Sequence, residues 1–411
     1  MKIAQGFSLV VFIVITLTST AKTSQNNFVV EIDSPAAPGS GEPNLAAGLD
    51  GRVYLSWLEP IQPKGHAFKY AVRSKDGKWS APRVITQGEN WFVNWADFPS
   101  ILALPNGSLA AHWLAKSGPG TYAYNVNLSI SRDGGTTWSK PIVPHRDGTQ
   151  TEHGFVSMIP ANGGIAAVWL DGRKMKAGEH GAEGHGTAAN EMSLMQTTIG
   201  LNGTLGAENL LDGRVCECCQ TSAAATPDGM AVVYRDRSEK EVRDIFIVRQ
   251  KNGKWSSPQN LSKDGWEING CPVNGPAISS SGRNLGVSWF TAVREQPRVY
   301  AVLSSDGGET FSAPMGVDDG NPIGRVDIIA LSSRDALVSW VERTAQGAEV
   351  RARIVNTNGV KALPIVVSAT NPARSSGFPR MEKSGDEVIF AWTDSGKVGK
   401  VRTAILKMTG N

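Results

Sequence analysis

Carboxylate, arginine and histidine side chains recur near one another in a chain of 411 residues. The candidates for acid–base catalysis are Asp97, Glu152, His153, Asp171 and Asp236. Two carboxylates in different environments can act as acid and base on a glycosidic bond, and histidine titrates near neutral pH. The candidates for substrate binding are Arg173, Arg235, Arg237, Arg325, Asp327 and Arg380. Arginine binds carboxylate, phosphate or sulfate through paired hydrogen bonds. Salt bridges between neighbouring structural elements are the alternative role for each of these residues.

Two tryptophans and four cysteines complete the candidate set. Trp91 and Trp95 lie outside the repeated aromatic pattern described below, so we expect them to stack on a sugar face. Cys216, Cys218 and Cys219 form a short cluster, and Cys271 follows at the corresponding place one repeat later. In an oxidising compartment two disulfides are favoured. A soft-metal site for Cu(I) or zinc and a catalytic thiol are the alternatives.

A repeat in the chain predicts the elements that position these residues. A short apolar run ending in an aromatic residue recurs seven times, at Trp57, Trp113, Trp169, Tyr234, Trp289, Trp340 and Trp392. An Asx-Gly or Ser-Gly turn precedes most of these runs, which is typical of a β-hairpin. Four strands in about 50 residues, repeated seven times, predict an all-β, seven-bladed β-propeller of four-stranded antiparallel blades. A six-bladed propeller is the alternative.

The ends of the repeat array predict how the ring closes. The last unit has room for three strands, and the segment 28–32 is an isolated strand at the other end. We expect this strand to complete the last blade, which leaves no open sheet edge. The loops between blades, and those between the second and third strands, then meet at one end of the ring. This end is called the site face, and the candidates above fall in its loops.

A second motif follows the aromatic in several units. Ser131-x-Asp133-x-Gly135-x-Thr137-Trp138 and Ser304-x-Asp306-x-Gly308-x-Thr310-Phe311 are complete copies. The aspartate can accept backbone N–H bonds across its own turn, and glycine can take a positive φ. The motif resembles the Asp-box, or BNR repeat, of the sialidase-like β-propeller superfamily, and the resemblance covers residues 28–411.

The resemblance implies a glycosidase site with three arginines on the substrate carboxylate, an aspartate as acid/base and a tyrosine–glutamate pair as nucleophile. The arginines above could supply the triad, Asp97, Asp171 or Asp236 the acid, and Glu152 a base. The segment 41–44 (Gly-Glu-Pro-Asn) stands where the family has Arg-Ile-Pro. We expect Tyr122, Tyr124 and Tyr300 in third strands, so no tyrosine nucleophile is predicted.

The favoured function is therefore an exported sialidase-like glycoside hydrolase acting on an anionic glycan, with no cofactor. A non-catalytic propeller that binds carbohydrate or protein, and a periplasmic metal-binding propeller that uses the cysteines and histidines, are the alternatives.

Composition and the first residues predict where the protein acts. Hydrophobic residues make up 40% of the chain and the net charge is +3, which argues against disorder and against binding to nucleic acid or an anionic membrane. Residues 1–22 have a basic start, a short apolar run and small residues, as in a cleaved signal peptide. We therefore expect a secreted or periplasmic protein with one propeller domain, residues 28–411, and no particular oligomeric state is predicted.

Overall fold

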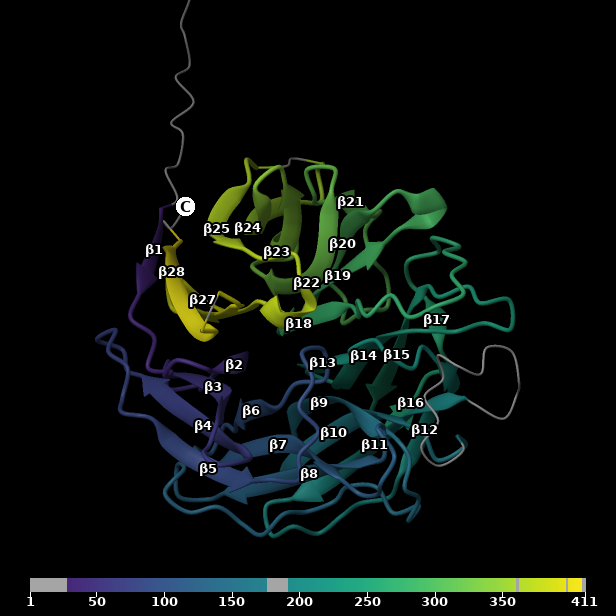
Figure 1. Ribbon diagram of the computed structural model, residues 1–411. Helices are drawn as coiled ribbons and strands as arrows, with labels where there is room; N and C mark the ends of the chain where they lie inside the picture. Colours follow the sequence, from purple (N-terminus) through teal and green to yellow (C-terminus); the bar gives the residue numbers. More distant parts are fainter. Residues whose placement is uncertain (1–27, 176–190, 360–361, 397, 409–411) are drawn as a thin grey trace, which may run out of the picture.

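The computed structural model describes residues 28–175, 191–359, 362–396 and 398–408. Its regular secondary structure is almost entirely β-strand, and the strands form seven antiparallel sheets around a central axis (Figure 1). The predicted seven-bladed β-propeller is confirmed, and the six-bladed alternative is wrong. The predicted signal peptide lies outside the described residues. Within the described part, no helix has the length and apolar character needed to cross a membrane.

The first three blades follow one another along the chain. Blade 1 consists of β2 (Gly41–Ala47), β3 (Val53–Pro60), β4 (His66–Arg73) and β5 (Arg83–Gly88). Blade 2 consists of β6 (Ser100–Ala103), β7 (Leu109–Lys116) and β8 (Tyr124–Ser131). A single bridge between Leu128 and Ile142 stands where its fourth strand would be. Blade 3 consists of β9 (His153–Ala161), β10 (Gly164–Asp171), β11 (Met192–Gly200) and β12 (Asn209–Val215).

The remaining blades complete the ring. Blade 4 consists of β13 (Ser222–Thr226), β14 (Gly229–Arg235), β15 (Ile245–Lys251), β16 (Lys254–Trp255) and β17 (Gln259–Asn260). Blade 5 consists of β18 (Ala277–Ser281), β19 (Asn284–Thr291), β20 (Arg298–Ser304) and β21 (Met315–Gly316). Blade 6 consists of β22 (Pro322–Ala330), β23 (Asp335–Thr344), β24 (Gly347–Asn356) and β25 (Ile365–Thr370). Blade 7 consists of β26 (Arg380–Ser384), β27 (Glu387–Asp394), β28 (Lys400–Lys407) and β1 (Val29–Ile32). Two short 3-10 helices, η1 (Val293–Glu295) and η2 (Arg374–Ser376), lie in loops.

The ring closes through β1, as predicted. This strand pairs antiparallel with β28, with Val29 opposite Leu406 and Ile32 opposite Thr403. An ion pair between Glu31 and Arg402 joins the same two strands. The first described strand and the last therefore share one sheet, in which β1 is the outer strand.

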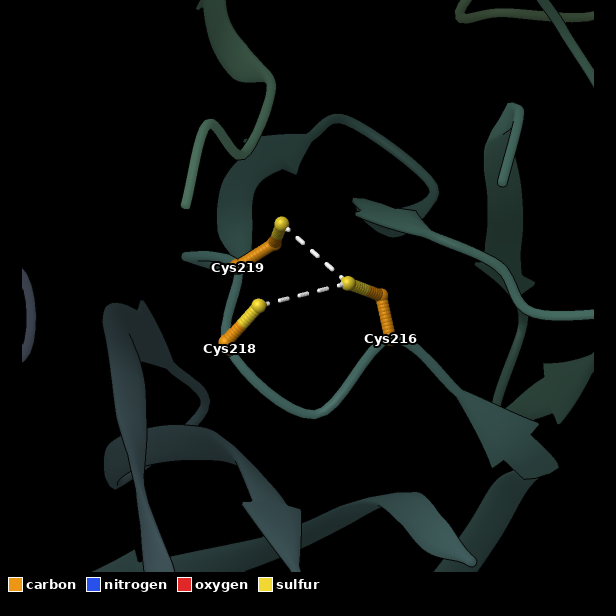
Figure 2. Close-up of side chains that lie close together, drawn as sticks. All are labelled: Cys216, Cys218 and Cys219. Atoms are coloured by element: carbon orange, nitrogen blue, oxygen red, sulfur yellow. Dashed lines mark hydrogen bonds between the residues drawn. The ribbon is translucent and has the colours of Figure 1, made fainter. Parts of the chain in front are cut away.

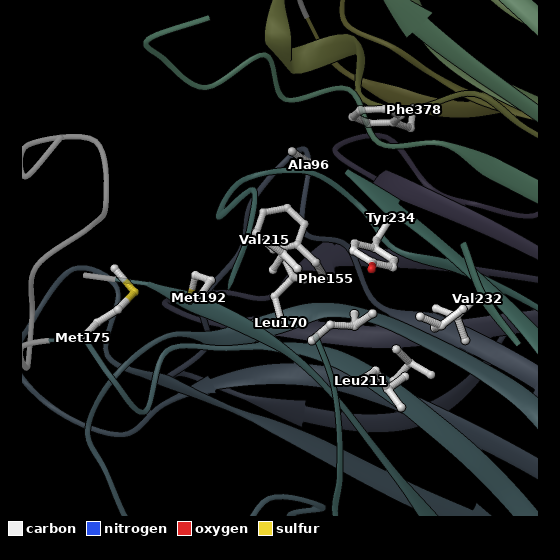
Figure 3. Packing of buried hydrophobic residues seen from close by; sticks show 13 residues of the cluster. Ala96, Phe155, Leu170, Met175, Met192, Leu211, Val215, Val232, Tyr234 and Phe378 are labelled. Carbon is white, nitrogen blue, oxygen red and sulfur yellow. The ribbon is translucent and has the colours of Figure 1, made fainter. Parts of the chain in front are cut away.

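The seven repeated aromatics lie on the second strand of their blades and are buried. They pack between neighbouring blades: Leu45 and Trp57 of blade 1, for example, share a cluster with Ile389 and Ala391 of blade 7. Figure 3 shows the corresponding cluster between blades 3 and 4, where Leu170 and Tyr234 meet. Burial of large apolar surface between blades fixes their positions around the axis.

The repeated aspartate turns have the predicted geometry. Asp133 accepts backbone N–H bonds from Thr136 and Thr137 at 3.0 and 2.9 Å. Gly135 has φ +90° and its carbonyl accepts a hydrogen bond from the Tyr70 hydroxyl of blade 1. A Cβ on Gly135 would lie 1.9 Å from that hydroxyl oxygen, so the position requires glycine. The turn thus also ties blade 2 to blade 1.

Candidate active site

The loops of the site face enclose a cavity of about 260 Å³. Its walls come from five inter-blade loops, through Asp97, Glu152, Cys218, Cys271 and Arg374, and from the β7–β8 loop, through Tyr122. Residues far apart in the sequence therefore meet at one end of the ring, as the repeat predicted. A second cavity, about 510 Å³ and lined by first strands, follows the central axis, and Asp97 lines both cavities.

Tyr124 stands between two carboxyl groups. Its hydroxyl oxygen lies 2.9 Å from Asp97 Oδ2 and 2.8 Å from Glu152 Oε1. All three side chains are buried, and all three line the cavity. Both carboxyl oxygens bond to the same hydroxyl oxygen, so the two acids lie close together at the cavity wall.

The backbone around the three residues holds them in place. Tyr124 begins β8, and its backbone N–H bonds Thr151 O at 3.2 Å, next to Glu152. Asp97 Oδ1 accepts the N–H of Phe155 at 2.7 Å. Gly154 makes this approach possible, because a Cβ there would lie 2.0 Å from Asp97 Oδ2.

The hydrogen bonds determine where the protons lie. A phenol has one hydrogen, so Tyr124 can donate to only one of the two carboxyl groups. Burial raises the pKa of Asp97 to about 8, with a smaller contribution from the negative charge of Glu152. Burial and the two carboxyl groups also raise the pKa of Tyr124 well above its ordinary value. At neutral pH a protonated Asp97 can therefore donate a hydrogen bond to Tyr124, and Tyr124 can donate one to Glu152. Asp97 thus holds a proton beside the cavity.

A positively charged rim adjoins this cluster. The guanidinium groups of Arg325 and Arg374 lie 5.1 and 5.9 Å from the ring centroid of Trp95, and Phe378 stacks on the same ring at 5.7 Å. Arg325 is buried and donates to Ser376 Oγ and to loop carbonyls. Burial and the nearby charge of Arg374 lower the pKa of Arg325 to about 10. Arg374 is exposed and lines the cavity, so it can meet an anionic ligand directly.

The other predicted catalytic residues of blade 3 form a separate cluster. His153 Nε2 lies 3.0 Å from Asp147 Oδ2, and the His145 ring stacks on His153 at 3.8 Å. Arg173 donates to both oxygens of Asp171 at 2.7 Å and lies 3.6 Å from Asp147. Burial opposes protonation of His153, but Asp147 and Asp171 outweigh it and raise its pKa. The donor set of His145, Asp147 and His153 could hold a cation, yet Arg173 already supplies positive charge, so we interpret the cluster as an internal ion-pair network.

The predicted arginines of blade 4 are also engaged within the protein. Arg235 is buried and donates to the carbonyls of Asn274, Phe290 and Arg243. Arg237 pairs with Glu241 at 2.8 Å.

Asp236, of the same loop, does not line the 260 Å³ cavity. Burial, together with the charge of Asp212, raises the pKa of Asp236 to about 7.

Asp327, Arg380 and Trp91 lie away from the three-residue cluster. Asp327 accepts the N–H of Met381 at 3.0 Å and joins blades 6 and 7, with Arg380 3.5 Å away. Arg380 lines the axial cavity. Trp91 packs against Trp113 at 6.1 Å. Of the five predicted arginines, all of them in the described part, none lines the 260 Å³ cavity, so no arginine triad is assembled there.

The cysteines form part of the cavity wall. Cys216 Sγ lies 3.2 Å from Cys219 Sγ and 3.8 Å from Cys218 Sγ (Figure 2). All four cysteines lie in the described residues and none of them forms a disulfide there, so the two predicted disulfides are absent. A disulfide requires sulfurs about 2.05 Å apart. Cys218 and Cys271 line the same cavity as Glu152.

The sequence reasoning missed Tyr122, Tyr124 and Arg374. Tyr122 lies in the β7–β8 loop and not in a strand, and Tyr124 is the first residue of β8. Its hydroxyl therefore reaches the site face, and the expectation that no tyrosine lies there is wrong. The signal that could have found Arg374 is its place in the loop before the first strand of blade 7, since Asp97 and Glu152 lie in the corresponding loops of blades 2 and 3.

No protein-family model matches the sequence, and no curated protein matches it significantly. Solved structures share its fold. The polysaccharide lyase Uly1 has a TM-score of 0.53 and 8% identity over 90% of each chain. A puromycin hydrolase has a TM-score of 0.51 and 13% identity over 88% of this chain and 52% of its own. A Hadza microbial sialidase has a TM-score of 0.45 and 12% identity over 78% of this chain and 66% of its own. The chain thus spans just under two thirds of that sialidase, and the likeness at these identities is one of fold alone.

Proposed function

We propose that the protein is an exported glycoside hydrolase that acts on an anionic glycan in the 260 Å³ cavity. The observation that carries the proposal is the hydrogen-bonded set of Asp97, Tyr124 and Glu152 at the cavity wall. An aspartate, a tyrosine and a glutamate are the residue types of sialidase-like catalysis; Asp97 and Glu152 were candidates from the sequence, and Tyr124 joins them in the structure.

Each residue has a role that its surroundings support. Asp97, with its pKa raised to about 8, is protonated at neutral pH and serves as the acid that protonates the leaving oxygen. Tyr124, whose hydroxyl contacts Glu152, is the nucleophile, and Glu152 takes its proton as base. Arg374 binds the anionic group of the glycan. This single exposed arginine takes the place of a triad, so we expect weaker selection for a carboxylate than three arginines would give.

The test uses a panel of sialylated and uronic-acid-containing oligosaccharides with the purified protein. Tyr124→Phe and Glu152→Gln should each lower turnover by at least about a hundredfold, the usual contribution of a positioned acid or base. The matched control is Tyr234→Phe, because Tyr234 also donates to a carboxylate, Asp212, but outside the cavity. Binding without product across the panel would contradict the proposal and favour a non-catalytic glycan-binding propeller. An unsaturated uronic acid product, with its new ultraviolet absorbance, would show elimination and contradict hydrolysis.

A further inference from the structure

The thiol cluster beside the cavity has a geometry that the proposed hydrolysis does not use. The sulfurs of Cys216, Cys218 and Cys219 all lie within 4.8 Å of one another, and all three residues are buried. Three sulfurs placed about 2.3 Å from one ion stand about 4 Å apart. The separations of 3.2 and 3.8 Å from Cys216 are close to that value, so an ion fits between them with small side-chain shifts.

Buried positive charge faces the sulfurs. Arg243 Nη1 donates to Cys216 Sγ at 3.3 Å. Arg235 is 1% exposed, and in the described part of the chain its guanidinium contacts carbonyl oxygens but no carboxylate within 4.0 Å. The Cys219 sulfur lies near this guanidinium, so positive charge stands beside the sulfur cluster. Only a thiolate, and not a thiol, ligates a metal ion.

The cluster also has the supporting contacts and the entrance that a metal site needs. The Asn274 backbone N–H bonds the Cys219 sulfur, and Arg243 bonds that of Cys216, so two of the three ligands are oriented from outside. Cys218 lines the 260 Å³ cavity, which gives an ion a path to the sulfurs.

We propose that Cys216, Cys218 and Cys219 bind one Cu(I) ion as three thiolates in the wall of the cavity. Soft sulfur ligands select Cu(I) and zinc among the common metals, and zinc in structural sites takes four ligands. Here three sulfurs come from one four-residue loop, and Cys271, the fourth thiol of the chain, contacts Cys218 but does not lie within 4.8 Å of all three sulfurs. Arg243, which also pairs with Glu217 and Glu241 at 3.0 and 2.9 Å, and Arg235 supply positive charge beside the three thiolates.

The experiment titrates Cu(I) into the reduced protein without oxygen, against a chromogenic Cu(I) chelator. We expect one copper ion per chain, sulfur-to-copper charge-transfer absorbance in the ultraviolet, and a copper X-ray absorption spectrum with three sulfur neighbours. Cys219→Ser should abolish stoichiometric binding. Cys218→Ser should do the same and is the safer change for folding, because its side chain faces the cavity.

Cys271→Ser is the matched control, since this residue lines the same cavity but is not one of the three ligands. It should keep one copper per chain. Loss of copper in Cys271→Ser, retention in the folded Cys218→Ser protein, or a native disulfide that leaves too few thiols would each overturn the proposal. A parallel titration with Zn(II) that showed four sulfur ligands and tighter binding than Cu(I) would overturn the choice of metal. Copper binding is measured without substrate. Failure to bind copper would therefore leave the glycan proposal intact, and failure to hydrolyse glycans would leave the copper proposal intact.

Discussion

Replacing Asp97 by asparagine tests the proton assignment on which the proposed chemistry rests. Asparagine has the same shape as a protonated aspartate: its oxygen can accept the Phe155 N–H, and its NH₂ group can donate to Tyr124. The substitution therefore keeps the hydrogen bonds of the neutral acid and removes only the ability to titrate.

The expected size of the effect follows from the pKa of Asp97, about 8 in the folded protein against an ordinary value of 3.8. Between these values the unfolded chain has lost a proton that the folded protein keeps, so stability falls by about 1.4 kcal/mol per pH unit as pH rises. At pH 7 the accumulated loss from this one group is of the order of 4 kcal/mol. Asp97→Asn removes it, and the variant should be more stable than the wild type at pH 7 but equally stable near pH 4.

The assay is denaturant unfolding of the two proteins at a series of pH values from 4 to 9. The difference in the free energy of unfolding should grow through this range and level off above pH 8. The same variant should have no measurable turnover, although it is more stable. A variant that is less stable than the wild type at pH 7 would mean that Asp97 is ionised there, and the assigned acid role would be refuted.

Four further changes test other parts of the structure. Gly154→Ala places a Cβ against Asp97 Oδ2, so turnover should fall steeply, while the melting temperature reports how much of the loss comes from unfolding. Arg374→Gln should raise KM for an anionic glycan about tenfold with little change in kcat, and a neutral glycan should show no such change. Trp289→Ala should cost about 3–5 kcal/mol in denaturant unfolding, because this side chain is fully buried between blades 4 and 5. Partial burial opposes ionisation of Asp306, but hydrogen bonds from Thr310 and Ser304 lower its pKa to about 2. Asp306→Asn should therefore destabilise the protein above pH 4, and the effect should shrink as pH falls through 2, the opposite pH trend to Asp97→Asn.

The fold could be predicted from the sequence because every blade contains the same pattern of apolar and aromatic residues. The aromatic at the end of every second strand, from Trp57 to Trp392, must be buried between blades, and its spacing sets the number of blades. The same register placed Asp97 and Glu152 in loops that meet at one end of the ring, which the common cavity bears out.

The partners of each charged side chain could not be predicted in the same way. Arg173 and Arg237 pair with carboxylates a few residues away, and Arg235 donates to backbone carbonyls. These contacts depend on the direction of each side chain, which the position in the repeat does not give. Tyr124 was missed for a related reason. Whether the Tyr124 hydroxyl reaches the site face depends on the residue at which β8 begins, within one or two positions. A sequence pattern locates the ends of a strand only to within one or two residues.

The pairing of β1 with β28 has a consequence for synthesis of the chain. Glu31 and Arg402, which join these strands, are 371 residues apart. A ribosome makes β28 only after all the strands of blades 1 to 6, so during translation β1, the outer strand of blade 7, has no strand to pair with. The finished ring, and with it the full stability of the site, can form only after the whole chain has emerged.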